Sequence, residues 1–149
     1  MPNVLERGQT IPDFTLPDAH GETVSSRSFY MRRNFVIALL PDGLDEAWSR
    51  WLARLQSALR NVPDGDAVCL IVGGDELAEV EPGESTCYLL VDRDRTIRSR
   101  VGVADEQGQL IITDRYGVIF HVATGYPVSP ELAPDEVPGW VEFIACRCS

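Results

Sequence analysis

Lysine is absent from this sequence, so all 13 of its basic residues are arginines. The absence excludes Schiff-base chemistry, which needs a lysine amine. Long hydrophobic stretches are also missing, since the apolar run over 35–40 is far shorter than the roughly 20 residues of a membrane-spanning helix. Residues 1–10 contain no apolar region typical of a signal peptide. We therefore expect a cytoplasmic protein that does not insert into membranes.

Positive charge is scarce as well, because 23 acidic residues against 13 basic ones give a net charge of −10. Such a chain repels the phosphates of nucleic acids and anionic membranes at long range, so neither is an expected partner. Metal ligands are few, since His20 and His121 are the only histidines. No metal and no other cofactor is predicted.

The apolar pattern predicts one α/β domain over residues 1–149, with no linker or repeat that would divide it. Uninterrupted apolar runs at 35–40, 67–72 and 87–91 are typical of strands that are buried on both faces of a sheet. Apolar residues at helical spacing over 44–59 form a single stripe, which predicts an amphipathic helix between the first two strands.

Turns and a late helix complete the predicted order of elements. A proline-rich segment, 126–138, leads to a last helix near 136–144 and then to a Cys-x-Cys tail. Alternating strands and helices followed by an antiparallel pair imply a mixed central sheet flanked by helices. Turn-forming residues predict two hairpins, the first from 14–16 with 22–24 and the second from 109–113 with 118–123.

Three stretches in order carry a family resemblance. Residues 8–29, GQTIPDFTLPDAHGETVSSRSF, contain Pro-Asp-Phe-x-Leu and then Asp-x-x-Gly. Residues 32–42, RRNFVIALLPD, end at a proline, and 111–122, IITDRYGVIFHV, place Asp and Gly between two apolar runs. Together they resemble the peroxiredoxin-like redoxins of the alkyl hydroperoxide reductase/thiol-specific antioxidant family, over roughly 8–125. The resemblance implies a thioredoxin-like fold with an N-terminal hairpin extension.

The active-site motif of that family does not carry over. Its members place the reactive cysteine in a Pro-x-x-x-Thr-x-x-Cys arrangement, and counting from Pro41 the matching positions hold Asp45 and Trp48. The arginine or cis-proline that relatives carry before the late strand is also missing, and Gly108 or a neighbour stands there. The resemblance thus implies a degenerate site at Pro41, Asp45 and Trp48. Tryptophan cannot attack an O–O bond, so peroxidase chemistry at this loop is excluded.

Several residues have both a structural and a functional interpretation. Trp48 belongs to the apolar stripe, which favours burial over a role as a binding aromatic at the old site. Cys69 lies within a strand and Cys87 begins one, so both are predicted to be structural thiols. His121 is predicted to be a structural histidine. The arginines of 93–100 alternate with acids, which indicates a solvated, ion-paired surface.

Cys146 and Cys148 are the candidate redox thiols. They could form a dithiol/disulfide couple or half of a metal site, or be two incidental thiols of a frayed tail. Residues two apart on a helix point to opposite sides. A bond between them therefore requires the chain to leave the helix by about Ala145.

We accordingly expect a redoxin-fold protein that lacks the peroxidase centre. Any remaining thiol–disulfide activity would use Cys146 and Cys148, with a thiol or disulfide protein as the partner. The alternative is a non-catalytic binding or dimerisation module, and the strands 109–113 and 118–123 offer an apolar edge for a homodimer. A metal-binding acidic loop, 75–84, is a third hypothesis.

Overall fold

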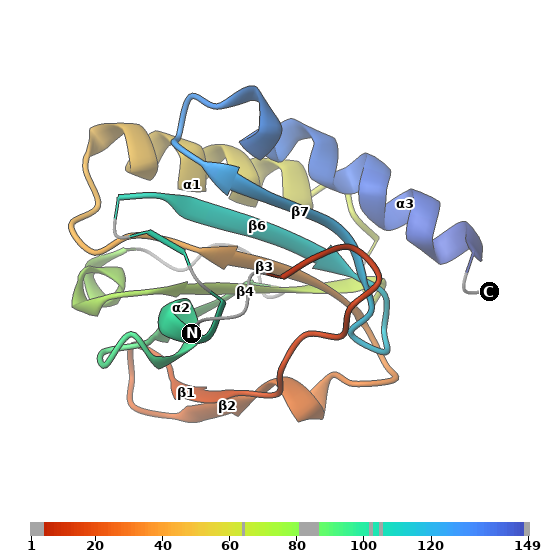
Figure 1. Cartoon of the computed structure of the whole chain (residues 1–149), viewed down its shortest axis with the longest axis horizontal. Helices are drawn as coiled ribbons and strands as arrows, with labels where there is room; N and C mark the ends of the chain where they lie inside the picture. Colours follow the sequence, from red (N-terminus) through yellow and green to blue (C-terminus); the bar gives the residue numbers. More distant parts are fainter. Residues whose placement is uncertain (1–4, 64, 81–86, 102, 105, 148–149) are drawn as a thin grey trace.

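The central feature is a five-stranded mixed sheet, seen here in a computed structural model that describes residues 5–63, 65–80, 87–101, 103–104 and 106–147. Its strands are β3 (Asn34–Leu39), β4 (Ala67–Gly73), β5 (Cys87–Val91), β6 (Gly108–Thr113) and β7 (Ile119–Gly125). They lie in the order β5-β4-β3-β6-β7 (Figure 1). The first three are parallel to one another, and β6 and β7 are antiparallel to their neighbours. The predicted mixed sheet is confirmed.

Helices cover both faces of this sheet. One face carries α1 (Glu46–Leu59) and α3 (Val137–Arg147), and the other carries α2 (Thr96–Val101) and the hairpin of β1 (Thr15–Pro17) and β2 (Thr23–Ser25) (Figure 1). None of the described helices has the length and apolarity that crossing a bilayer requires. Short 3-10 turns complete the chain: η1 (Ser26–Ser28), η2 (Asp75–Glu79), η3 (Pro130–Leu132) and η4 (Pro134–Glu136).

The continuous apolar runs of the sequence follow from this three-layer arrangement. Alternate side chains of β3 point to opposite faces, so Val36 and Ala38 join the core under α1 and α3. Phe35 and Ile37 join the core under α2 and the hairpin. Both faces of the strand are therefore shielded from water, and every residue of β3 after Asn34 is apolar.

Two expectations about local structure are wrong. Helix α3 continues to Arg147, beyond the predicted range of 136–144, so the condition for a Cys146–Cys148 bond, a helix that ends by about Ala145, is not met. The Arg147 guanidinium lies 4.4 Å from the ring centroid of Phe143, and this contact between neighbouring turns stabilises the end of the helix. Arg98 is buried, not solvated, and donates hydrogen bonds to the backbone oxygens of Ala104 and Gln107. It thereby fixes the segment that leads into β6.

Candidate functional site

The loop after β3 contains the positions of the predicted degenerate site. Pro41 is buried directly after the strand, and Asp45 is the N-cap residue of α1. The Asp45 carboxylate accepts a hydrogen bond of 2.9 Å from the backbone N–H of Trp48. A carboxylate therefore already uses the positive end of the helix, the environment that would stabilise a thiolate.

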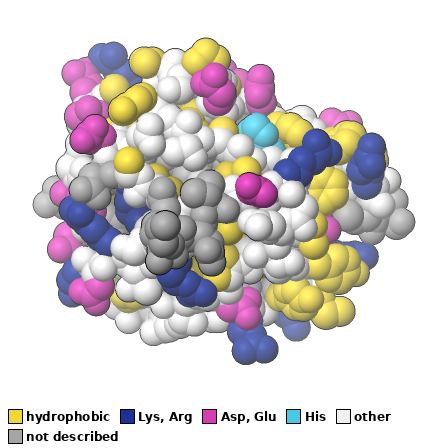
Figure 2. Space-filling model, viewed as in Figure 1, with side chains coloured by type: hydrophobic (Ala, Val, Ile, Leu, Met, Phe, Trp, Pro, Cys, Tyr) yellow, Lys and Arg dark blue, Asp and Glu magenta, His cyan; other side chains and the backbone are white. Residues whose placement is uncertain are grey.

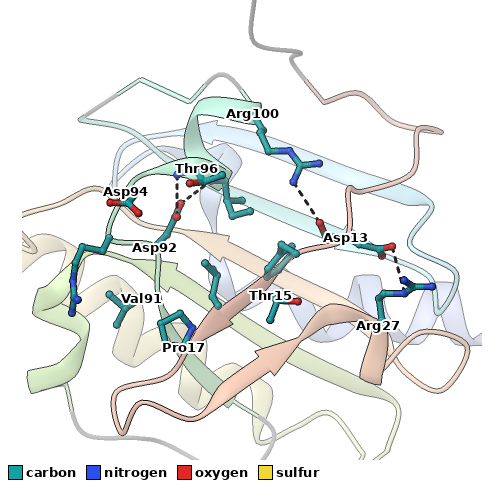
Figure 3. A pocket seen from close by; sticks show the side chains of 13 residues that line it. Asp13, Thr15, Pro17, Arg27, Val91, Asp92, Asp94, Thr96 and Arg100 are labelled. Atoms are coloured by element: carbon teal, nitrogen blue, oxygen red, sulfur yellow. Dashed lines mark hydrogen bonds and ion pairs between the residues drawn. The ribbon is translucent and has the colours of Figure 1, made fainter.

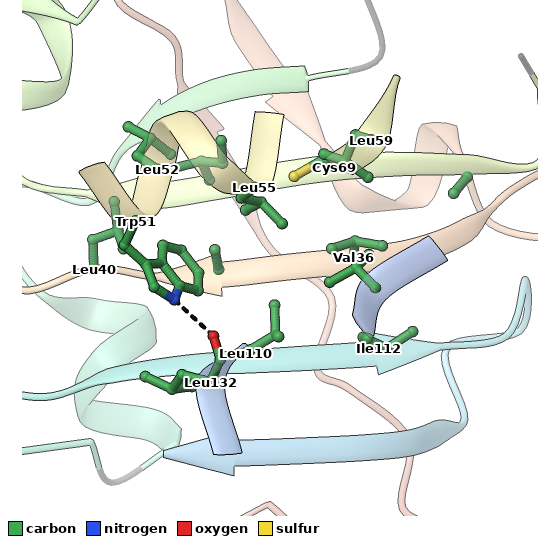
Figure 4. Packing of buried hydrophobic residues seen from close by; sticks show 14 of the residues in the cluster. Val36, Leu40, Trp51, Leu52, Leu55, Leu59, Cys69, Leu110, Ile112 and Leu132 are labelled. Carbon is green, nitrogen blue, oxygen red and sulfur yellow. Dashed lines mark hydrogen bonds between the residues drawn. The ribbon is translucent and has the colours of Figure 1, made fainter. Parts of the chain in front are cut away.

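Trp48 is part of the core, as predicted, with 3% of its surface exposed. Its indole packs edge-on against Trp51, with ring centroids 5.5 Å apart and an interplanar angle of 73°. Trp51 in turn donates a buried 2.7 Å hydrogen bond from Nε1 to the backbone oxygen of Leu132 (Figure 4). This pair of tryptophans ties α1 to the segment that precedes α3.

Gly108 makes room for the indole of Trp48. A Cβ atom at position 108 would lie 2.4 Å from Cη2 of Trp48 and 3.1 Å from the backbone oxygen of Leu39. Trp48 and Gly108, which the sequence comparison singles out separately, are therefore in close contact. The bulky residue at one is accommodated by the missing side chain at the other, a link that the sequence alone did not reveal.

Interactions between loops close the same end of the sheet. Asp42 accepts a 2.7 Å hydrogen bond from Nε of Arg95, and the backbone N–H of Gly43 donates to Glu76 at 3.0 Å. Arg93 pairs with Asp75 at 2.9 Å. The ion-paired arginines were predicted, but their partners lie on other loops and not among the neighbouring acids. The loops that follow β3, β4 and β5 are thus tied together over the filled site.

The exposed thiol of Cys146 lies in the last turn of α3, far along the chain from that loop. It borders a pocket of about 530 Å³ between α3 and the segment that follows α1. The walls are mainly apolar, formed by Val62, Pro63, Pro138, Val141 and Ala145, with Asp66 and Glu142 also present. Cys148, the second candidate thiol, lies outside the described residues.

The other two cysteines lie side by side. Cys69 on β4 and Cys87 on β5 are directly paired residues of adjacent parallel strands. The pKa of Cys69 is raised well above its usual value by its hydrogen bond with Cys87, by burial and by the charge of Cys87. The sequence pattern predicted two structural thiols but not their pairing. Their pairing follows from the register between β4 and β5, since Cys69 is the third residue of its strand and Cys87 the first of its own.

His121 has a structural environment, as expected. Its ring stacks on Trp140 with centroids 4.8 Å apart and an interplanar angle of 21°. The pKa of His121 is lowered by burial, against the opposing charge of Glu136 and a backbone hydrogen bond at Glu131. Among the described residues, no group of three or more His, Cys, Asp or Glu side chains could hold a metal ion.

A second pocket, of about 720 Å³, lies between the hairpin and α2 (Figure 3). Its charged groups pair within the protein: Arg27 lies 3.8 Å from the carboxylate of Asp13, and Arg100 donates to the Asp13 backbone oxygen at 3.4 Å. Asp92 is buried and accepts hydrogen bonds from the backbone N–H groups of Thr96 and Ile97. It caps α2 and so has a structural role.

No family model and no curated protein matches this chain. Solved structures do match. A thiol peroxidase from Chromobacterium violaceum is 16% identical with a TM-score of 0.74, covering 96% of this chain and 90% of its own. The reduced 2-Cys peroxiredoxin of Plasmodium vivax is 14% identical with a TM-score of 0.75, and the match covers 96% of this chain and 98% of the peroxiredoxin. A proposed thiol:disulfide interchange protein DsbE from Chlorobium tepidum is 20% identical with a TM-score of 0.66, and the match covers 95% of this chain and 98% of the DsbE chain.

These similarities extend over nearly the whole chain, while the identities are low. They show a thioredoxin-like fold and confirm the predicted fold class, including the N-terminal hairpin. They do not transfer an activity, because function depends on the residues of a site and not on the fold.

Proposed function

We propose that this protein is a redoxin-fold thiol–disulfide exchange protein without peroxidase activity, in which Cys146 is the reactive thiol. The partner is a protein thiol or disulfide, and Cys148 is the candidate second thiol toward such a partner, since the continuation of α3 past Ala145 disfavours an internal Cys146–Cys148 bond. The observation that supports the proposal is a contrast between the start of α1 and the end of α3. Trp48, in the first turn of α1, is buried and carries no thiol, while an exposed thiol lies beside a largely apolar pocket at the end of α3.

The surroundings of Cys146 suit slow exchange better than peroxide reduction. Mixed disulfides form by attack of an accessible thiol, and the thiol of Cys146 is exposed. Cys146 also lies at the C-terminal end of α3, whereas the helix N-terminus that activates peroxidatic thiols is occupied by Asp45 in α1. A partner segment could place an apolar side chain against Val62 and Pro138 while its sulfur meets Cys146.

Timed alkylation of the reduced protein tests the assignment of the thiols. We expect Cys146 to be alkylated well before Cys69, because Cys69 is only 1% exposed and its pKa is raised. We further expect Cys146 to form a mixed disulfide with a small disulfide and to return with mild reductant. Equal alkylation rates for Cys69 and Cys146 would contradict the assignment.

Peroxide turnover tests the excluded chemistry. With a dithiol reductant, the protein should consume hydrogen peroxide and alkyl hydroperoxides no faster than its Cys146→Ser/Cys148→Ser variant. The loop after β3 supplies no thiol, and tryptophan is not a nucleophile. Enzyme-like turnover that persists in the double variant would refute the proposed loss of peroxidase activity.

A binding or dimerisation module is the second candidate, favoured by one exposed patch. Tyr30, Met31 and Tyr116 are 46%, 60% and 38% exposed. The Tyr30 and Tyr116 rings are in edge contact at 6.2 Å, and the backbone N–H of Met31 donates to Arg115 O. Figure 2 shows hydrophobic side chains gathered at one end of the molecule, whereas charges of both signs are interspersed. Tyr30→Ser/Met31→Ser should abolish self-association in light scattering, and a dimer that is unaffected would reject this patch.

A further inference from the structure

We propose that Cys69 and Cys87 form an internal dithiol, separate from the tail cysteines, that a small disulfide oxidises to a bond between β4 and β5. The proposal goes beyond the exchange function assigned to Cys146, because it involves other residues in another part of the molecule and stands without that function.

The backbone brings the two sulfurs together. Cys69 and Cys87 are paired in register across adjacent parallel strands, and neighbouring strands lie about 4.8 Å apart. Disulfides span Cα separations of roughly 4.4–6.8 Å, so the two strands need no rearrangement to be linked. Both side chains belong to the core under α1, and Figure 4 shows Cys69 beside Leu59. The hydrogen bond between the two thiols places each within reach of the other.

Access to the two thiols differs, and this sets the order of events. Cys87 is partly exposed at the start of β5, which is an edge strand of the sheet. Cys69 is buried within β4. A small disulfide from solvent therefore reaches Cys87 first, and Cys69 can react only through Cys87.

The chemistry proceeds as two thiol–disulfide exchanges. The Cys87 thiolate attacks one sulfur of glutathione disulfide, forms a mixed disulfide and releases one glutathione thiolate. Cys69 then attacks the Cys87 sulfur, forms the Cys69–Cys87 bond and releases the second glutathione, which takes up the proton from Cys69. Two protein thiols are oxidised by two electrons, and one glutathione disulfide is reduced to two glutathione molecules.

The first exchange assists the second. The hydrogen bond and the negative charge of Cys87 both hold the pKa of Cys69 high. Once Cys87 is part of a mixed disulfide, its charge is gone and only burial still disfavours the Cys69 thiolate. The buried thiol thus becomes a better nucleophile at the moment when its target is formed.

The test uses the full chain with Cys146→Ser/Cys148→Ser, so that the tail thiols cannot contribute. After incubation with glutathione disulfide and alkylation of the remaining thiols, we expect both remaining thiols to be lost. Peptide mapping should find a Cys69–Cys87 link that dithiothreitol reverses. The further variant Cys69→Ser should stop at the mixed disulfide on Cys87, and Cys87→Ser should leave Cys69 reduced.

Accumulation of the mixed disulfide on Cys87 with Cys69 still present would overturn the proposal, as would oxidation of neither thiol while far-ultraviolet circular dichroism shows a folded protein. Peptide mapping of the Cys146→Ser/Cys148→Ser variant distinguishes these outcomes, so the test does not depend on whether the Cys69→Ser and Cys87→Ser variants fold. Oxidation of Cys146 and Cys148 in the parent chain, with Cys69 and Cys87 reduced, would leave the exchange function standing and refute only this inference.

Discussion

Gly108→Ala is the substitution that tests most directly whether Trp48 occupies space which a side chain at position 108 would need. The new Cβ would lie 2.4 Å from Cη2 of Trp48, so the indole must move. Overpacking of a core by one carbon typically costs about 1–3 kcal/mol. At an unstrained strand position the same change would be favourable by roughly 0.5–1 kcal/mol. We therefore expect the free energy of unfolding to fall by about 1–3 kcal/mol.

A double-mutant cycle separates this clash from other effects. Trp48→Leu removes the atoms that the new Cβ would meet but keeps an apolar side chain at position 48. In that background Gly108→Ala should be close to neutral, with only the contact to the Leu39 backbone oxygen still tight at 3.1 Å. The two substitutions should therefore show a coupling free energy of at least about 1 kcal/mol.

Urea unfolding followed by far-ultraviolet circular dichroism measures all four proteins, because this signal does not depend on the tryptophan removed. Gly139→Ala is the matched control. It lies in α3, where an added Cβ would meet no other atom within 4 Å, so the substitution should stabilise the protein by roughly 1 kcal/mol. A Gly108→Ala variant as stable as the parent, or a coupling below about 0.5 kcal/mol, would refute the reasoning.

Buried polar groups support three further predictions. Asp92→Ala should cost about 1–2 kcal/mol in urea unfolding because it removes the cap of α2, whereas exposed Asp94→Ala should stay within about 0.5 kcal/mol. Trp51→Phe should cost about 1–3 kcal/mol by leaving the Leu132 carbonyl without its buried donor. His121 should titrate below its ordinary pKa of about 6.5 by NMR, because burial lowers its pKa. The unfolded chain then binds a proton that the folded one does not, so stability should fall as the pH drops below about 6.5, and His121→Gln should remove that part of the slope.

Local patterns of apolar residues predicted the helices and strands of this fold, but they did not predict the contacts between segments that are distant in the sequence. The apolar stripe over 44–59 located α1 and the burial of Trp48, because helical periodicity is a property of one segment. The contact between Trp48 and Gly108 depends on β6 entering the sheet next to β3, which no single segment encodes. The pairing of Cys69 with Cys87 likewise depends on the register between two strands.

Charge patterning failed for a different reason. Alternating acids and arginines over 93–100 are typical of a solvated surface, and Arg93 conforms to that expectation. Arg98 does not, because the turn of α2 points its guanidinium toward the backbone oxygens of Ala104 and Gln107. A buried arginine of this kind is stabilised by backbone carbonyl groups. Every residue has such a group, so residue types alone cannot identify the partner of the arginine.

The departures from the redoxin pattern are best understood as one connected change. The indole of Trp48 needs volume, and Gly108 supplies it by having no side chain. Asp45 takes up the backbone N–H of residue 48, so the positive end of α1 already has its negative partner. Asp42–Arg95 and Gly43–Glu76 then fix the loop in place. The buried indole and the Asp45 cap together occupy the start of α1, where a thiolate would need both the space and the backbone N–H. A single substitution at position 45, 48 or 108 would therefore leave the contacts of the other positions in place.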